Sequence, residues 1–170
     1  SSDLTGYSVQ QMTESPTLDR IDLRLLALLQ RDGRATNADI AAQVNLSPSA
    51  CLRRIQRLEA TGVIAGYAAR VDPKAIGMGL QAFVRVQLEK HDPASVQLFG
   101  DGVRARDEVV ACYALTGDMD YLLHVVVQDL EHFSRFLLDG LLNASGVADV
   151  NSSFVLRAVK TDAGLPLPKA

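Results

Sequence analysis

The chain has 170 residues, a hydrophobic fraction of 48% and a net charge of −3 at pH 7. This apolar content is enough for a folded core and excludes a disordered protein, and the length allows one ordinary domain or two small ones. There is no run of about 18 apolar residues and no basic segment followed by an apolar stretch. We therefore expect no membrane span, no secretory signal and a cytoplasmic location.

The first 17 residues are predicted to be a disordered leader. Residues 1–11 are polar and without pattern, and Met12, followed by Thr-Glu-Ser-Pro, resembles a native start. We therefore leave this segment out of the fold prediction. The two cysteines, Cys51 and Cys112, are far apart and lack the spacing of metal ligands, so we expect buried free thiols, with neither a disulfide nor a metal site.

Three short helices are predicted for residues 18–66. Apolar residues keep helical spacing over residues 19–31, and Gly33 follows as a stop. A second helix is predicted for residues 36–46, and a tight turn separates it from a third over residues 47–57. Two helices joined by a three- to four-residue turn have the spacing of a helix-turn-helix. Residues 18–62 hold seven arginines and five acidic residues, a local net charge of +2.

The third helix carries the strongest signal for DNA binding. Ser47 is a good N-cap, and Pro48 suits the first helical position. At about 100° per residue, one face holds Leu52, Ile55 and Leu58 and is predicted to pack on a core. The opposite face holds Ala50, Arg53, Arg54 and Arg57. An arginine face on a surface helix is more often simply solvated, but the capped helix and turn before it favour a DNA-binding domain.

Each residue of this predicted interface has an expected role. The predicted DNA-contacting residues are Arg34, Ser47, Ser49, Ala50, Arg53, Arg54 and Arg57. We expect Ser49, Ala50, Arg53 and Arg54 to meet base edges, Arg57 to meet phosphate, and Ser47 and Arg34 to contact the DNA backbone. A symmetric dimer would place two such helices roughly 34 Å apart, so we expect a near-palindromic double-stranded site.

After a linker strand or hinge at residues 67–79, residues 80–162 alternate between strands and helices, and residues 163–170 form a tail. An extended segment over residues 63–73 is interpreted as a strand or small wing.

The predicted strands are 80–89, 109–115, 121–127 and 147–160, and helices start at Asp92 and Asp129. Leu130, Phe133, Leu137 and Leu141 are expected to form the buried face of the second helix. The order is that of a ferredoxin-like βαββαβ domain, which makes the fold class α+β. Apolar residues expected on the open sheet face, where a dimer would bury them, are Phe83, Tyr113, Val126 and Val155.

Several stretches together resemble the Lrp/AsnC family, the leucine-responsive or feast/famine regulators. The matching stretches are Leu18-Asp19-Arg20-Ile21-Asp22, the helix from Leu46-Ser47 to Arg57, the segment Leu58-Glu59-Ala60-Thr61-Gly62-Val63-Ile64-Ala65-Gly66-Tyr67, and Gly117-Asp118-Met119-Asp120-Tyr121-Leu122. The resemblance covers about residues 18–160. It implies a transcription regulator whose C-terminal domain dimerises, binds an amino acid and often assembles further, to a tetramer or octamer.

The same resemblance implies an effector site at the turn of the second and third strands. The implied residues are Thr116, Gly117, Asp118, Asp120 and Tyr121, with Ser152 and Ser153 from the last strand. An amino acid needs a carboxylate for its ammonium, which Asp118 or Asp120 could supply, and amide donors for its carboxylate. Leucine or methionine is the favoured effector, and no other cofactor is expected. Without the resemblance, this segment would be interpreted as a solvated hairpin turn.

Two other functions remain open at this point. A ferredoxin-like domain can host an amino-acid-processing enzyme, but His91, His124 and His132 share no ligand spacing and no catalytic motif occurs, so we expect no catalytic residues. The arginine face could instead contact an acidic protein in an interaction module without DNA binding. Salt-sensitive, sequence-selective DNA binding distinguishes these functions from a regulator.

Overall fold

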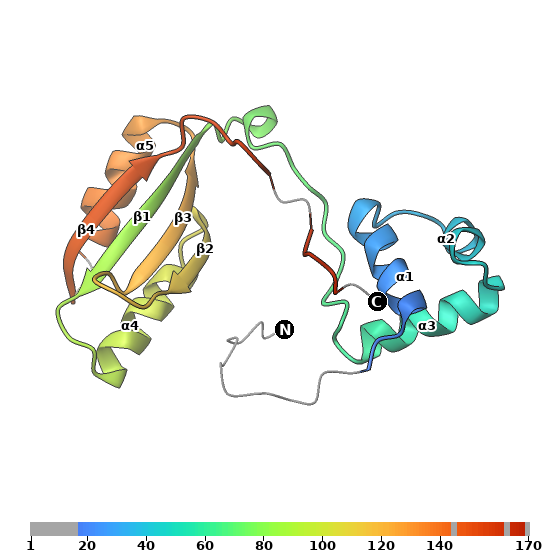
Figure 1. The fold of residues 1–170 in the computed structure, drawn as a ribbon. Coiled ribbons are helices and arrows are strands. Elements are labelled where there is room, and N and C mark those ends of the chain that lie inside the picture. Colours follow the sequence, from blue (N-terminus) through green and yellow to red (C-terminus); the bar gives the residue numbers. More distant parts are fainter. Residues whose placement is uncertain (1–16, 144–145, 162–163, 169–170) are drawn as a thin grey trace. The chain divides into compact units, whose positions relative to one another are not determined.

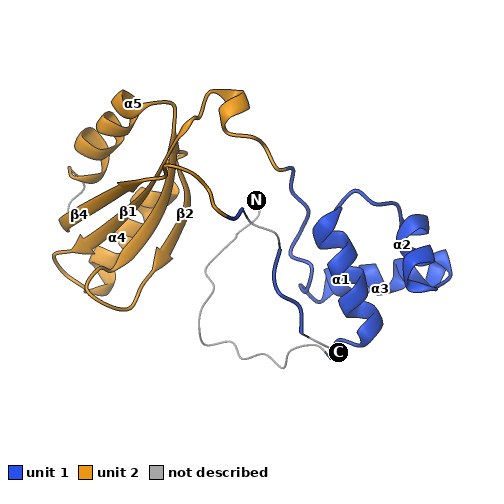
Figure 2. Ribbon diagram, turned by 45° about the horizontal axis from the view of Figure 1, so that its top comes forward, with its two compact units in different colours: residues 1–69, 160–170 blue, residues 70–159 orange. Residues whose placement is uncertain are grey.

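The computed structural model describes residues 17–143, 146–161 and 164–168. The chain divides into two compact units, one of residues 1–69 with 160–170 and one of residues 70–159 (Figure 2). The predicted leader, residues 1–17, lies outside the described residues except for its last residue. Among the described helices, none has the length and apolar character needed to cross a bilayer.

The N-terminal unit consists of three helices, as predicted. They are α1 (Arg20–Arg31), α2 (Asn37–Val44) and α3 (Pro48–Ala60) (Figure 1). Each helix begins at a side-chain cap, because Asp19, Thr36 and Ser47 each accept a hydrogen bond from a backbone N–H of the first turn. Asn45, with φ of 57°, ends α2 in the left-handed conformation and produces the tight turn before α3.

The core of this unit corrects the predicted buried face of α3. Leu52, expected in the core, is 45% exposed, whereas Cys51 is fully buried with Ile55 and Leu58. Cys51, Ile55 and Leu58 are spaced by four and three residues, which places them on one helical face. The buried residues that pack together are Leu25, Ile40, Ala41, Val44, Cys51 and Ile55. The buried face of α3 is therefore rotated about the helix axis from the predicted face, by about a third of the 100° step between successive residues.

The strand that was one interpretation of residues 63–73 is not formed. All of these residues are described, and they form bends and irregular backbone followed by a short helical turn, η1 (Lys74–Ile76). The segment turns back on α3, because the Ile64 N–H donates to the Leu58 carbonyl and the Tyr67 hydroxyl donates to Glu59 at 3.0 Å. Gly66, with φ of 155°, interrupts the extended backbone within the predicted strand.

The second unit has the predicted ferredoxin-like fold. Its strands are β1 (Leu80–Leu88), β2 (Val109–Ala114), β3 (Tyr121–Val127) and β4 (Val147–Phe154), and they form one antiparallel sheet in the order β2-β3-β1-β4. Helix α4 (Pro93–Arg104) and helix α5 (Leu130–Arg135) cover the same face of the sheet (Figure 1). Helix α5 continues into a π-helical turn, η2 (Phe136–Leu141).

Alternate residues of β1 and β3 build the core against the helices. The buried members are Ala82, Val84, Val86, Leu88, Leu123, Val125 and Val127, packed with Phe99, Val103, Phe133, Phe136 and Leu141. Leu130, predicted to be buried, is 64% exposed, and the buried face consists of Phe133, Phe136 and Leu141, with the π turn placing Leu141 five residues after Phe136. Strand β4 ends at Phe154, which pairs with Ala82 near the start of β1, and not at residue 160. Cys112, predicted to be buried, is exposed.

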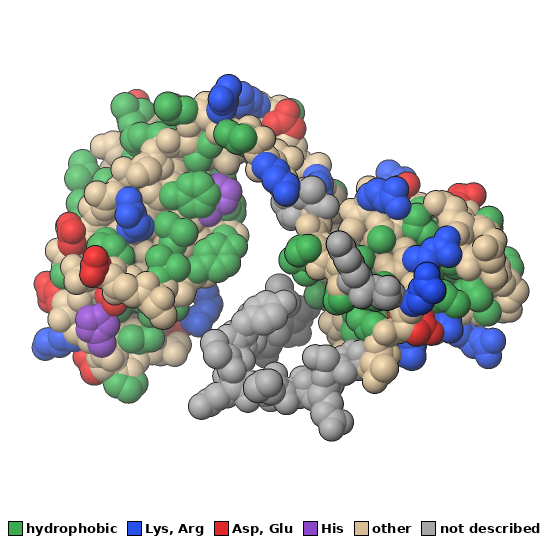
Figure 3. Space-filling view, viewed as in Figure 1, with side chains coloured by type: hydrophobic (Ala, Val, Ile, Leu, Met, Phe, Trp, Pro, Cys, Tyr) green, Lys and Arg blue, Asp and Glu red, His purple; other side chains and the backbone are tan. Residues whose placement is uncertain are grey.

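The other face of the sheet is open in this chain. Phe83 and Tyr113 are exposed there as predicted, and Figure 3 shows hydrophobic side chains gathered around a histidine on this unit. His124 stacks on Phe83 with ring centroids 4.8 Å apart, and burial lowers the pKa of His124. Val155 is half-buried. Val126 is already buried within the chain, which corrects its predicted role as an exposed contact.

Candidate functional site

The outward face of α3 is defined by the residues that the core leaves exposed. At 100° per residue, Arg53 lies almost directly opposite the buried residues, close to the centre of the outward face, and Ser49 and Gln56 lie next to it on that face. All three side chains are exposed, and Leu52 lies at the edge of the same face. Among the described residues, no carboxylate lies within salt-bridge distance of Arg53. This guanidinium therefore stands free at the middle of the helix.

The neighbouring arginines are bound to α1. Asp22 is only 1% exposed, and both of its carboxylate oxygens are used by α3. Arg54 Nη1 donates to Asp22 Oδ1 at 2.9 Å, and Arg57 Nη2 donates to Asp22 Oδ2. A buried carboxylate requires such compensation, because an unpaired charge in the protein interior is strongly destabilising. Asp22 thus connects α1 to two successive turns of α3, and we call this contact the Asp22 clamp.

Asp19 strengthens the Asp22 clamp from the N-cap of α1. Arg54 Nη1 also donates to Asp19 Oδ2 at 2.6 Å. Asp19 accepts from the Asp22 N–H at 2.8 Å while Asp22 accepts from the Asp19 N–H at 3.1 Å, which is a capping box. The pKa of Asp19 is lowered, first by the backbone hydrogen bond from Asp22 and then by Arg54. The pKa of Arg54 is raised by its bonds to Asp19 and Asp22.

The remaining predicted DNA-contacting residues surround the start of α3. Ser47 is the N-cap of α3. Its hydroxyl accepts a hydrogen bond from the Ala50 N–H at 3.3 Å and lies 3.2 Å from the Ser49 hydroxyl. Ala50 is half-buried. Arg34 is exposed in the turn between α1 and α2, where its backbone N–H donates to Asp32 at 2.9 Å. The structure thus gathers Ser47, Ser49 and Ala50 at one helix end.

Sequence reasoning missed Asp22 and Gln56. Gln56 was overlooked because the predicted face was turned away from it. Asp22 offered a signal, since it lies three residues before Leu25 and four before Leu26, both of which are buried. A carboxylate within an apolar stripe indicates a partner, but the partner is 32 residues further along the chain and has no local signature.

In the second unit, the turn between β2 and β3 is tied to β1 by Asp120. The Leu88 N–H donates to Asp120 Oδ2 at 2.7 Å, and His91 Nε2 lies 2.8 Å from Asp120 Oδ1. The Asp120 N–H also donates to the Val86 carbonyl at 2.9 Å. The pKa of Asp120 is lowered, first by the Leu88 amide and then by His91. This carboxylate is therefore committed to the protein's own groups.

Asp118 is the exposed carboxylate of the same turn. Thr116, Gly117 and Asp118 are all exposed, and among the described residues no cation lies within salt-bridge distance of Asp118. Gly117 has φ of 118° and open space around its α-carbon, so its backbone is accessible. The Tyr121 ring packs on Phe99 with centroids 4.6 Å apart, and burial raises the pKa of Tyr121.

The two predicted serines of β4 are not brought to this turn within one chain. Ser152 pairs with Val84 of β1 and Ser153 pairs with Phe83, so the serines point to opposite faces of the sheet. Tyr121, at the start of β3, pairs further along β1 with Val86, and β1 separates β3 from β4. Ser152 is half-buried and Ser153 is exposed on the open sheet face.

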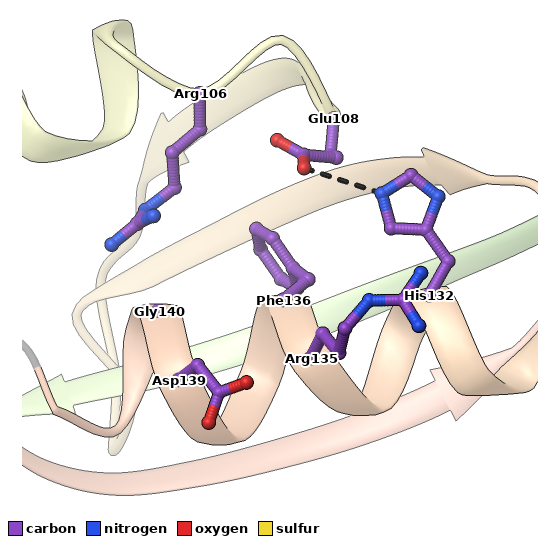
Figure 4. A pocket seen from close by; sticks show the side chains of 7 residues that line it. All are labelled: Arg106, Glu108, His132, Arg135, Phe136, Asp139 and Gly140. Carbon is purple, nitrogen blue, oxygen red and sulfur yellow. Dashed lines mark hydrogen bonds and ion pairs between the residues drawn. The ribbon is translucent and has the colours of Figure 1, made fainter.

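A shallow cleft of about 290 Å³ lies over α5 and η2 (Figure 4). Its lining residues are Arg106, Glu108, His132, Arg135, Phe136, Asp139 and Gly140. His132 Nε2 lies 3.3 Å from Glu108, and the Arg106 guanidinium lies against Gly140. Two arginines and two carboxylates balance each other here, so the cleft has no net charge that would select an ion. None of the predicted effector residues lines it.

Comparison with known proteins covers both units. The profile of the Lrp/AsnC ligand-binding domain matches residues 81–165, and that of a winged helix-turn-helix DNA-binding domain matches residues 18–65. The chain is 40% identical over 150 residues to the Bkd operon transcriptional regulator of Pseudomonas aeruginosa, covering 88% of this chain and 98% of the relative. It is 38% identical over 143 residues to the leucine-responsive regulatory protein of Escherichia coli, covering 84% and 87%.

One solved structure aligns with residues of both units. A transcriptional regulator of Neisseria meningitidis, solved as a complex with L-methionine, aligns with a TM-score of 0.85 and 45% identity. The alignment covers 88% of this chain and 97% of that chain. The likeness therefore extends over both units and not over one domain alone.

Proposed function

Because this chain belongs to the Lrp/AsnC family of transcriptional regulators, we propose that it binds near-palindromic promoter DNA through α3 and that an amino acid, methionine or leucine, controls this binding. The DNA-binding role follows from the family and its winged helix-turn-helix domain. The residues, the effector and the oligomer are our proposal. The observation that carries it is the guanidinium of Arg53, unpaired among the described residues, at the centre of an exposed face of α3 beside arginines that are bound to α1.

On the DNA side, we assign distinct roles to the three arginines of α3. Arg53, with Ser49 and Ala50, meets base edges, since the first turns of a recognition helix enter the major groove. Arg57 is half exposed, so it contacts phosphate while it remains paired with Asp22. Arg54 has two carboxylate partners and serves to position α3, in place of its predicted contact with a base. Ser47 and Arg34 contact the DNA backbone.

This assignment is tested by comparing Arg53→Ala with Arg54→Ala. Duplexes selected from a random pool by the parent protein serve as specific probes, with scrambled duplexes for comparison. We expect Arg53→Ala to weaken specific binding by roughly 5- to 150-fold, the effect of about 1–3 kcal/mol per arginine-guanine contact, and to leave the melting temperature unchanged. Arg54→Ala is expected to lower the melting temperature as well.

Arg104→Ala is the matched control, because Arg104 is an exposed arginine of the second unit paired with Asp101. It is expected to change neither measurement. Equal binding by the parent and Arg53→Ala would contradict the proposed interface. Binding that depends on salt but not on base sequence would favour a non-specific interaction module.

On the effector side, Asp118 is the proposed partner of the ammonium group. Of the two carboxylates in the turn, Asp118 is exposed and unpaired among the described residues, whereas Asp120 holds β1. The backbone around Gly117 offers amide donors for the effector carboxylate. Thr116, Tyr121, Ser152 and Ser153 complete the proposed site. The relative solved with L-methionine supports this class of ligand.

A thermal-shift titration with L-methionine and L-leucine tests the effector. A ligand that binds only the folded protein stabilises it by about 2.7 kcal/mol at 100 times its Kd, so the melting temperature rises. We expect this rise in the parent and in Asp139→Ala, a control at an exposed carboxylate outside the turn, and its loss in Asp118→Ala. A rise that survives in Asp118→Ala would place the ammonium elsewhere.

The proposed active form is a homodimer that assembles further, to a tetramer or octamer. The open sheet face carries Phe83, Tyr113 and half-buried Val155, and an exposed apolar face of this kind is typical of a subunit interface. Two DNA-binding units are also needed to read two half-sites. Sedimentation of Phe83→Asp is expected to show a smaller assembly than the parent.

A further inference from the structure

The C-terminal segment, residues 164–168, is docked on α1. Gln30 Nε2 donates to the Leu165 carbonyl at 3.2 Å, and the Leu165 N–H donates back to Gln30 Oε1. One side-chain amide thus satisfies both backbone groups of one residue, as a neighbouring strand would. This pair of hydrogen bonds fixes the position of the segment along the helix.

Gly164 shows that the docking is specific. Its φ of 88° lies in the left-handed region, which favours glycine. A Cβ built on Gly164 would lie 2.6 Å from Gln30 Oε1, closer than any real contact of this kind. The positive φ favours glycine at this position, and a Cβ would in addition displace the amide end of Gln30 that holds Leu165.

The rest of the segment covers a face of α1 that the core does not use. Leu167 and Pro168 line a groove of about 280 Å³ with Arg20, Leu23, Arg24 and Ala27. At 100° per residue, these positions are centred opposite the buried residues Asp22, Leu25 and Leu26, and Gln30 lies at the edge of the same face. Pro166 and Pro168 favour extended backbone and have no N–H to satisfy, which suits a segment lying along a helix.

The docked segment connects the two units a second time. The DNA-binding unit is joined to the second unit by the linker of residues 70–79. A docked C-terminal segment adds a second connection, because the chain that leaves β4 in the second unit continues to residues 164–168 in the first. Two tethers restrict the relative motion of two units far more than one flexible linker does.

We propose that residues 164–168 are a strap whose docking on α1 is required for an amino acid bound to the second unit to change DNA affinity. The partner of this face of α1 is the chain's own Gly-Leu-Pro-Leu-Pro segment, whose Leu167 and Pro168 form one wall of the groove. The docking itself depends only on the contacts with Gln30 and the groove. The coupling role rests on the proposed effector function.

The strap is tested in the full chain with Gly164→Ala, which places a Cβ against Gln30, and with Gln30→Ala, which removes both hydrogen bonds. Gly102→Ala is the control, since nothing lies within 4 Å of its added methyl group. The first measurement is amide hydrogen exchange at Leu165. We expect exchange about tenfold faster in both variants and unchanged in the control.

The second measurement is the ratio of DNA Kd with and without saturating L-methionine. We expect this ratio to approach one in both strap variants, while the Kd for DNA alone and the Kd for methionine stay within about twofold of the parent. Unchanged exchange at Leu165 would overturn the docking. Faster exchange with an unchanged Kd ratio would overturn the coupling role. A parent that does not respond to methionine would overturn the proposed effector and the coupling role together, and exchange at Leu165 would still decide the docking.

Discussion

Asp22 in the first unit and Asp120 in the second each lie beside a predicted binding site, and each binds the protein's own groups. Asp22 is buried and holds two guanidinium groups of α3. Asp120 is 21% exposed and holds a backbone amide and a histidine ring. In both places, the charged residue that contacts the ligand is expected to be the exposed neighbour, Arg53 or Asp118. The difference is that Asp22 is held by two guanidinium groups, whereas Asp120 is held by a backbone amide and a histidine ring.

The largest effect on stability and DNA binding is expected from removing the charge of Asp22. Asp22→Asn keeps the shape of the side chain but leaves Arg57 without a carboxylate and Arg54 with Asp19 alone. We expect the free energy of unfolding to fall by about 2 kcal/mol, since hydrogen bonds to charged groups contribute about 1.5–3 kcal/mol. Because α3 loses its connection to α1, DNA Kd is expected to rise about tenfold.

Urea unfolding and DNA titration measure both effects. Asp101→Asn is the matched control, because it removes an exposed carboxylate paired with Arg104 at 2.6 Å, a contact worth at most about 1 kcal/mol. A loss for Asp22→Asn no larger than that of the control would mean that the Asp22 clamp does not hold α3.

A smaller effect is expected at the second anchor. Asp120→Asn should lower the free energy of unfolding by about 1 kcal/mol, because Asn can still accept from Leu88 but carries no charge. The folded-state pKa of Asp120 is depressed, so its contribution is complete above the ordinary value of 3.8 and is lost as the pH falls through the folded-state pKa.

The parent is therefore expected to lose more stability than Asp120→Asn below about pH 4. Urea unfolding at a series of pH values measures this difference. Parallel curves for the two proteins would show that the hydrogen bonds of Asp120 do not favour its ionised form.

The smallest effect concerns His124 on the open sheet face. Burial lowers its folded-state pKa below 6.5, so the unfolded chain binds its proton more readily. Stability is expected to decrease as the pH falls below 6.5, by less than about 1 kcal/mol for a half-exposed group. His124→Gln keeps a donor for Gln81 and should remove this part of the pH dependence in urea unfolding. An identical decrease in the variant would exclude His124 as its cause.

Local patterns were sufficient to predict most of the fold. Caps at Asp19, Thr36, Ser47, Asp92 and Asp129 mark where helices begin, and the period of two over residues 80–88 marks a buried strand. The failures occurred where tertiary packing decides. The buried face of α3 depends on whether Cys51 or Leu52 enters the core, and both fit an apolar helical pattern.

The site was less predictable for the same reason. Arg54 and Arg53 look alike in the sequence, and the difference between them arises from Asp22 on another helix. Likewise, Asp118 and Asp120 are equivalent carboxylates of one turn until the Leu88 amide is placed beside one of them. Strand β4 was predicted too long because the end of its partner cannot be read from its own residues.

The two thiols of the chain have opposite accessibility, one in each unit. Cys51 is fully buried among the three helices, whereas Cys112 is exposed on the second unit, and desolvation raises the pKa of both thiols. An alkylating reagent therefore reaches Cys112 in the native protein but reaches Cys51 only when the helical unit opens. The rate of Cys51 labelling therefore measures how often the DNA-binding unit opens. It can be measured in the unmodified chain, with and without DNA.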